Sequence, residues 1–175
     1  MLTILPIFYL SILTIFLLIL SWVITKQLKT IFLLESQFQY FLDESQNVPL
    51  KAEEVLAFAK VSVAKKCFTK AVIESQFALK TYNAAKYQLI SAQIYNMLGF
   101  IYYEASQKTL AQEFYQKAIE LDPNYIIALN NLAKIYEDIQ DWQKAVILYS
   151  KVLNLNPGNY IAANRKIVIE KTQNL

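Results

Sequence analysis

A repeat of thirty-four residues is the feature that most limits what this chain can fold into. Residues 92–125 and 126–159 align with each other without a gap. Identical residues recur at that spacing as Leu98 and Leu132, Tyr102 and Tyr136, Ala111 and Ala145, Tyr115 and Tyr149, Leu121 and Leu155, and Pro123 and Pro157. A self-similar period of this length is typical of two-helix units that bury their apolar faces only by stacking. The sequence therefore predicts an all-α solenoid.

The two copies resemble the tetratricopeptide repeat, whose consensus places a Leu-Gly pair, tyrosine, alanine, an aromatic residue and proline at fixed positions. These positions hold Leu98, Gly99, Tyr102, Ala111, Tyr115, Ala118 and Pro123 in the first copy, and Leu132, Ala133, Tyr136, Ala145, Tyr149 and Pro157 in the second. We expect the small residues to let the two helices of a repeat approach closely, with the tyrosines filling the space between them. The prolines should end the second helix, because proline lacks the amide donor that continues it.

Less regular sequence on either side of the two copies predicts another helix pair and a cap. Residues 49–91 read as a degenerate first repeat, in which Ser62 and Ser75 stand where the later copies have tyrosine. The next copy starts late, so either the second helix of this repeat extends or the loop 81–86 bulges. Residues 160–175 predict a capping helix. Its apolar residues are expected to cover the preceding repeat: Ala162, Ala163, Ile167 and Val168.

The N-terminal residues 1–25 predict a transmembrane anchor. No charged residue precedes Lys26, and about 24 apolar residues extend about 36 Å as a helix, enough to cross a hydrocarbon core of about 30 Å. We expect residues 2–25 to contact the lipid bilayer. A cleaved signal peptide is the alternative, but it would need a positive n-region and a small-residue cleavage site. Because Lys26 and Lys29 follow the anchor, the positive-inside rule places the rest of the chain on the cytoplasmic side or its stromal equivalent.

Residues 26–48 predict an amphipathic neck helix. Apolar residues recur there at spacings of three and four, with acidic and amide residues between them. Such a helix can lie on the bilayer or pack under the repeats. The segment 47–49 should end the neck, and Pro49 should begin the next helix, since proline suits the first helical position.

The composition argues against catalysis, metal binding and nucleic-acid binding. The chain has no histidine and one cysteine, so the commonest general base and the commonest transition-metal ligand are missing. Its glycines, Gly99 and Gly158, form no phosphate-binding loop. The net charge of +3 is too small to indicate a nucleic-acid partner. We therefore expect no enzyme activity, no cofactor and no metal site.

The expected binding surface is a groove lined by the first helix of each repeat. Projecting the repeat positions onto that helix selects Asn96, Phe100, Tyr103, Asn130, Asn131, Lys134, Glu137 and Arg165. Asparagine side chains donate and accept hydrogen bonds, so they can hold the backbone of an extended peptide. An ordinary solvated face is the alternative. The clamp that some tetratricopeptide domains use for a chaperone's C-terminal carboxylate fits less well, because Phe100 and Ile161 occupy positions that need Asn and Lys.

An anchor followed by about three tetratricopeptide repeats and a cap resembles a family of membrane-anchored photosystem I assembly proteins of plastids and cyanobacteria, encoded by a hypothetical chloroplast reading frame. The resemblance implies a single-pass protein of the plastid thylakoid membrane, with its repeats on the stromal side. It also implies a scaffold that binds photosystem I subunits or assembly intermediates. The alternative is a membrane-anchored receptor or tether for an import, secretion or envelope complex, for example in a bacterial inner membrane with the repeats cytoplasmic.

Overall fold

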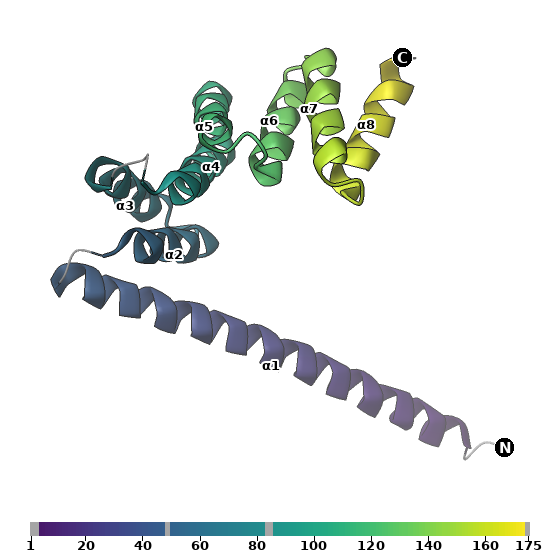
Figure 1. Cartoon of the computed structure of the whole chain (residues 1–175). Coiled ribbons are helices and arrows are strands. Elements are labelled where there is room, and N and C mark those ends of the chain that lie inside the picture. The colour runs from purple at the N-terminus through teal and green to yellow at the C-terminus, as the bar shows by residue number, and fades with distance from the viewer. Residues whose placement is uncertain (1–3, 48–49, 83–85, 174–175) are drawn as a thin grey trace. The chain divides into compact units, whose positions relative to one another are not determined.

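The computed structural model describes residues 4–47, 50–82 and 86–173. These residues contain eight α-helices and no strand, so the predicted all-α fold is confirmed. The helices are α1 (Ile4–Asn47), α2 (Ala52–Ala64), α3 (Phe68–Thr81), α4 (Gln88–Glu104), α5 (Lys108–Leu121), α6 (Ile126–Asp138), α7 (Trp142–Leu155) and α8 (Tyr160–Gln173). They form two units: residues 1–49, which hold α1, and residues 50–175, which hold the other helices (Figure 1).

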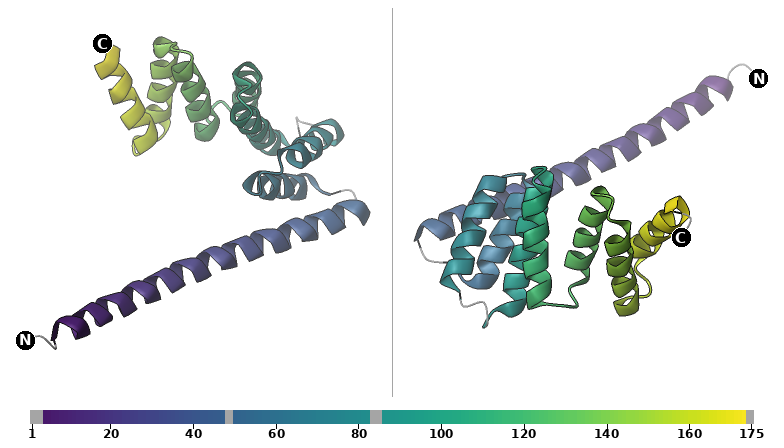
Figure 2. Two further views of the ribbon diagram at one scale, coloured as in Figure 1. Left: turned by 180° about the vertical axis from the view of Figure 1, so that it is seen from behind. Right: turned by 90° about the horizontal axis from the view of Figure 1, so that it is seen from above.

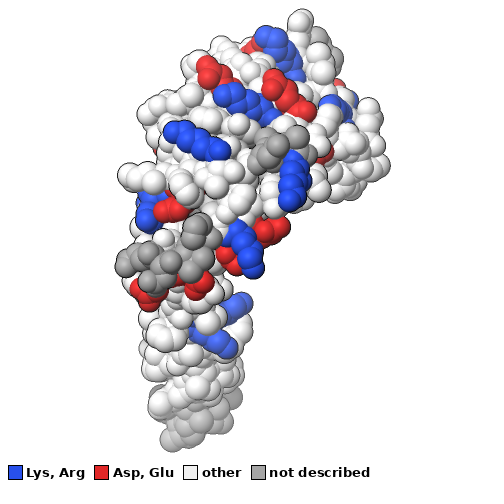
Figure 3. Space-filling view, turned by 60° about the vertical axis from the view of Figure 1, so that its left-hand side comes forward, with Lys and Arg blue, Asp and Glu red and all other residues white. Residues whose placement is uncertain are grey.

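The first unit is a single helix of 44 residues, α1. It is long and apolar enough to cross a membrane, over Phe8–Ser45, and the most apolar stretch is not buried against protein. Figure 3 shows much of its surface without acidic or basic side chains. The predicted neck belongs to this same helix, because no residue between the apolar run and Asn47 breaks the backbone hydrogen-bond pattern.

The second unit is built from antiparallel helix pairs that follow one another in chain order (Figures 1 and 2). The pairs are α2 with α3, α4 with α5, and α6 with α7, and α8 packs against α7. We call the first helix of each pair its A helix and the second its B helix. Each pair buries its apolar faces against the next pair, as expected for a tetratricopeptide solenoid.

Close packing within a repeat depends on the small residues of the consensus. Ala111, Ala118 and Ala145 are inaccessible to solvent, and the rings of Tyr115 and Tyr149 are buried beside them. Tyr115 also joins Leu132 and Ile135 in a cluster that links the second repeat to the third. The prolines of the consensus lie outside the helices: α5 ends at Leu121 and α7 at Leu155, each shortly before its proline.

The first repeat differs from the predicted one in where its extra residues lie. Its B helix, α3, has 14 residues like α5 and α7, so the expectation that this helix extends is wrong. The alternative, a bulge of the loop 81–86, involves residues 83–85, which lie outside the described residues. Instead, α4 begins at Gln88, before the predicted start of the second repeat at Ala92, and has 17 residues where α6 has 13. The α2 helix begins at Ala52, after a cap at Lys51, so the expectation that Pro49 begins this helix is wrong. Pro49 itself lies outside the described residues.

The last helix covers the third repeat with a different face from the predicted one. Ala162 and Ile169 are buried against the repeat, together with Leu129 and Val152. Ile167 and Val168 are 48% and 50% exposed, so their predicted covering role is wrong. The reason is the helical period: Ile169 is seven residues from Ala162 and lies on the same face, whereas Ile167 and Val168 are turned away from it.

We expect Gly99→Ala to lower the free energy of unfolding by about 1–3 kcal/mol, the usual cost of overpacking. A Cβ atom at Gly99 would lie 2.6 Å from Cδ1 and Cε1 of the buried Tyr115 ring, so this ring must move. Urea unfolding of the full chain in detergent micelles, followed by circular dichroism, measures the loss. Gly158→Ala is the control, because an added Cβ there comes no closer than 3.4 Å to Asn156. Equal stability of both variants would contradict this packing account.

Candidate functional site

Two neighbouring hollows open along the A helices, on either side of Phe100. The first hollow has a volume of about 390 Å³ and is lined by Lys60, Gln93, Asn96, Met97, Phe100, Tyr125 and Ile127. The second hollow has a volume of about 110 Å³ and is lined by Phe100, Tyr103, Tyr115, Asn131 and Lys134. Phe100 is 37% exposed and belongs to both. We call the two hollows together the A-helix groove.

Side-chain hydrogen bonds connect neighbouring A helices along the A-helix groove. The side-chain nitrogen of Asn131 donates to the side-chain oxygen of Asn96 at 3.0 Å, which ties α6 to α4. Lys60 donates to the amide oxygen of Gln93 at 3.3 Å and ties α2 to α4. These bonds join residues about one repeat apart, so they hold adjacent A helices in register. Each amide retains further donor or acceptor capacity for a ligand.

A carboxylate at the edge of the second hollow is held by three neighbours. Asp138 accepts hydrogen bonds from Tyr103 at 2.8 Å and from Lys134 at 2.6 Å, and Lys108 lies 3.5 Å away. Partial burial opposes ionisation of Asp138, but the hydrogen bonds from Lys134 and Tyr103 outweigh it and lower its pKa. Burial, with the bond to Asp138 in second place, raises the pKa of Tyr103 to about 12. At neutral pH, Tyr103 is therefore a neutral donor beside a charged acceptor.

A second buried carboxylate connects the last three helices. Glu137 is 9% exposed; it accepts a hydrogen bond from Tyr149 at 3.1 Å and pairs with the guanidinium of Arg165. The Nε atom of Arg165 donates at 3.0 Å. Burial raises the pKa of Tyr149 to about 12. Because Glu137 and Arg165 bind each other, their first role is to hold α8 on the solenoid.

The predicted groove residues thus fall into two sets, with Asn130 in neither. Five of them line the two hollows: Asn96, Phe100, Tyr103, Asn131 and Lys134. Glu137 and Arg165 form the tie to α8, and the buried side-chain oxygen of Asn130 has no hydrogen-bond partner among the described residues. With Arg165 occupied by Glu137, the arrangement gives no separate support to a carboxylate clamp.

Several residues of the groove were not identified from the sequence. Gln93 and Ile127 line the first hollow and occupy equivalent positions in successive repeats, thirty-four residues apart. Projecting that position would have found both. Lys60 and Tyr125 could not be found this way: Lys60 lies in the irregular first repeat, and Tyr125 lies in the turn before α6.

The described residues contain no group of three or more His, Cys, Asp and Glu side chains that could hold a metal ion. Cys67 occupies the N-cap position of α3, and its thiol donates to the carbonyl oxygen of Lys65 at 3.8 Å. The chemistry of the A-helix groove is therefore that of amides, aromatic rings, lysines and a carboxylate, which suits recognition of a polypeptide.

Comparison with known proteins defines the class. Residues 92–125 and residues 114–147 each match the tetratricopeptide repeat family. The first tetratricopeptide domain of Spaghetti (RPAP3), solved with an HSP90 peptide, has the same fold, with a TM-score of 0.62 at 17% identity over 71% of this chain and 94% of that one. The chain is a tetratricopeptide repeat protein, a protein-interaction scaffold of a kind that is not an enzyme family.

Full-length relatives then define the family. The chain is 60% identical over 174 residues to the ycf37 protein of Pyropia yezoensis, and the match covers 98% of both chains. It is also 30% identical over 117 residues to the chloroplastic protein PYG7 of Arabidopsis thaliana, over 66% of this chain and 38% of that protein. The chain belongs to the ycf37 family, whose members are plastid-encoded, and both relatives indicate a plastid protein.

Proposed function

We propose that this protein is a membrane-anchored scaffold that assists the assembly or stabilisation of photosystem I. In this proposal α1 crosses the thylakoid membrane once, the repeats lie in the stroma, and the A-helix groove binds photosystem I subunits or assembly intermediates. The observation that carries the proposal is the pair of hollows around Phe100, which gives a tetratricopeptide protein a preformed place for a polypeptide.

The anchor is supported by the chemistry of α1. From Phe8 to Trp22 the exposed side chains are mostly apolar, and the exceptions are Ser11, Thr14 and Ser21. The hydroxyls of Ser11 and Thr14 donate to backbone oxygens within the same helix. A helix without charges over such a length is stable in lipid, where its backbone groups are already bonded.

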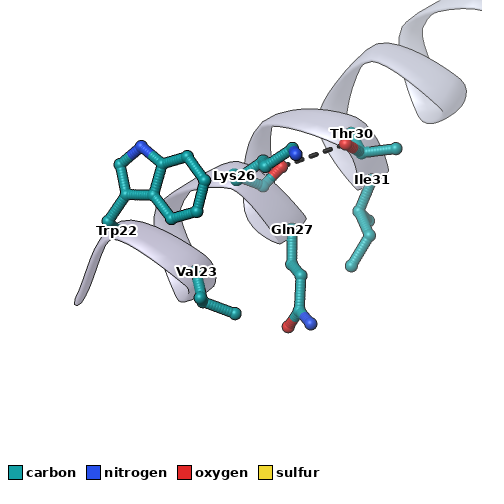
Figure 4. Close-up of a pocket in the computed structure, with 6 residues that line it drawn as sticks. All are labelled: Trp22, Val23, Lys26, Gln27, Thr30 and Ile31. Carbon is teal, nitrogen blue, oxygen red and sulfur yellow. Dashed lines mark hydrogen bonds between the residues drawn. The ribbon is translucent and has the colours of Figure 1, made fainter. Parts of the chain in front are cut away.

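The end of the proposed span is marked by an aromatic and a cationic residue. The ammonium of Lys26 lies 5.3 Å from the centre of the Trp22 ring, on one face of the helix (Figure 4). Tryptophan and lysine are both favoured at the level of lipid headgroups. The proposed orientation, with the repeats in the stroma, is supported by Lys26 and Lys29, the first charges after the apolar run.

The A-helix groove favours a peptide with apolar side chains next to polar backbone. Met97, Phe100 and Ile127 supply the apolar lining of the first hollow, and Asn96 and Gln93 offer amide groups beside it. Such a mixture matches the usual composition of binding sites, where apolar contacts give affinity and a few polar groups fix orientation. Photosystem I as the source of that peptide rests on the family resemblance.

Phe100→Ser should reduce capture of photosystem I subunits by about 30-fold, the effect of losing a hot spot worth about 2 kcal/mol. The measurement is affinity purification of the tagged full chain from detergent-solubilised thylakoid membranes, with the eluate quantified by mass spectrometry. Ile147→Ser is the control, because Ile147 is 66% exposed on α7 and lines neither hollow. An eluate of the unmodified protein that lacks photosystem I subunits, or that holds instead an import or secretion complex, would refute the proposed partner.

A further inference from the structure

The outward face of α3 carries exposed apolar side chains between lysines. Ile73 is 56% exposed and Phe77 is 51% exposed. Lys66, just before the helix, and Lys80, in its last turn, are exposed. The spacing from Ile73 to Phe77 and on to Lys80 is four and three residues, which places these three along one stripe of the helix. Lys66 lies in the turn that precedes α3.

Equivalent positions in the other B helices show that this stripe is unusual. The counterparts of Ile73, Phe77 and Lys80 in α5 are Glu113, Lys117 and Glu120, a solvated face of mixed charge. In α7 the counterparts are Ile147, Lys151 and Asn154. Only α3, of the three B helices, combines two large apolar side chains with lysines and no acidic residue at these positions. The repeat architecture does not require this composition, since α5 forms the same helix without it.

The segment 60–86, which contains α3, is rich in positive charge. Residues 60–86 contain six lysines and one acidic residue, Glu74, hence five net positive charges, whereas the whole chain has +3. Lys70 pairs with Glu74 at 3.0 Å. Lys60 lies on α2 and donates to Gln93, so the exposed lysines at the two ends of α3 are Lys66 and Lys80. The remainder of the chain is, by difference, net negative.

We propose that the outward face of α3 binds an anionic lipid surface, the membrane in which the chain is anchored. Exposed apolar residues flanked by lysines are the signature of a helix that lies at a lipid interface, where the apolar side chains enter the headgroup region and the lysines attract anionic lipids.

This inference rests on the proposed anchor, which keeps the repeats close to a bilayer. Tethering makes a weak surface contact effective, because the second interaction becomes intramolecular. A contact through α3 would orient the solenoid on the membrane, in addition to α1 holding it there. The A-helix groove, which is made of A helices and not of α3, would remain available to a partner.

The test places a fluorophore on α3 and measures its quenching by nitroxide-labelled headgroups. The full chain with Cys67→Ser and Thr69→Cys is labelled and reconstituted into phosphatidylcholine vesicles with or without phosphatidylglycerol. Thr109→Cys in the same background is the matched control, since Thr109 occupies the equivalent exposed position of α5. We expect the Thr69 label to be quenched at least about twofold more than the Thr109 label in the anionic vesicles, and added salt to reduce the difference by screening.

Two further variants separate charge from apolar contact. The extra quenching at Thr69 should be abolished by Lys66→Glu with Lys80→Glu and, separately, by Ile73→Ser with Phe77→Ser. The control, Lys151→Glu with Lys171→Glu, changes the net charge as much as the first variant and should leave the extra quenching unchanged. Equal quenching at Thr69 and Thr109 in anionic vesicles would overturn the inference, as would an α3 face that instead mediates association of two copies. Vesicle flotation distinguishes the two proposals: a protein that fails to float refutes the anchor, and one that floats without quenching at Thr69 refutes only the contact of α3.

Discussion

Glu137→Ala should lower the free energy of unfolding by about 2–4 kcal/mol, because breaking a buried ion pair leaves its partner without compensation. The Glu137 carboxylate accepts from Tyr149 at 3.1 Å and from Arg165 at 3.0 Å, so its removal strands a hydroxyl and a guanidinium at the junction of three helices. The Arg165 side chain is 38% exposed, and water will satisfy part of it. For that reason we expect a smaller loss of stability than for a fully buried ion pair.

Urea unfolding of the full chain in detergent micelles, followed by circular dichroism, measures this loss. Glu170→Ala is the matched control, because Glu170 pairs with Lys166 at 3.8 Å on the exposed part of the neighbouring helix. Surface pairs of that kind contribute about 0–1 kcal/mol. Glu137→Gln keeps the hydrogen-bonding shape and should lose less than Glu137→Ala. If Glu137→Ala and Glu170→Ala had the same small effect, the network would not be what holds α8 in place.

Deleting residues 2–25 should move the protein from the membrane fraction to the wash when membranes are stripped with alkaline carbonate. A charge-free helix of about 24 residues gains far more free energy from lipid than a surface helix does. Its deletion should therefore replace integral attachment by, at most, peripheral binding. Residual binding through the neck or α3 is peripheral, and the carbonate wash removes it. The expected outcome is retention of the unmodified chain and release of the shortened one, measured by immunoblot.

Substitution within the helix provides a milder form of the same test. Leu17→Lys with Leu18→Lys places two charges in the middle of the apolar run, each unfavourable by about 2.5–3.5 kcal/mol. Replacing residues 2–25 with an unrelated apolar helix of equal length should restore retention. A shortened chain that stays with carbonate-washed membranes would contradict the proposed anchor and place the attachment in the repeats or the neck.

The repeat architecture could be predicted from the sequence because its physical requirements are local. Ala111 and Ala145 must be small to let two helices touch, and Tyr115 and Tyr149 must fill the adjoining space, so each copy carries the same residues at the same spacing. The long apolar run of α1 could also be predicted from the sequence, because its length and hydrophobicity suffice to recognise it. These signals do not depend on what the chain binds.

The structure differs from the sequence-based predictions where the thirty-four-residue period breaks and where a side chain has two possible neighbours. Part of the extra length between the first and second repeats extends α4 at its start. A periodic comparison cannot distinguish an earlier start of one helix from a later end of another. Glu137 and Arg165 occupy positions that usually face a ligand, yet each satisfies the other's charge. A sequence shows the position of a charged residue on a helix and leaves open which neighbour it meets, since that depends on tertiary contacts.

Site-specific photo-crosslinking from Phe100 tests the central claim most directly. A photoreactive phenylalanine analogue at Phe100 points into both hollows, and the same analogue at Glu113 lies on the outward face of α5, away from the A-helix groove. After irradiation of intact thylakoid membranes, cross-linked products are identified by mass spectrometry. A scaffold that holds its partner in the groove predicts photosystem I subunits cross-linked from Phe100 and not from Glu113. Equal cross-linking from both positions, or products from Phe100 without a photosystem I subunit, would contradict it.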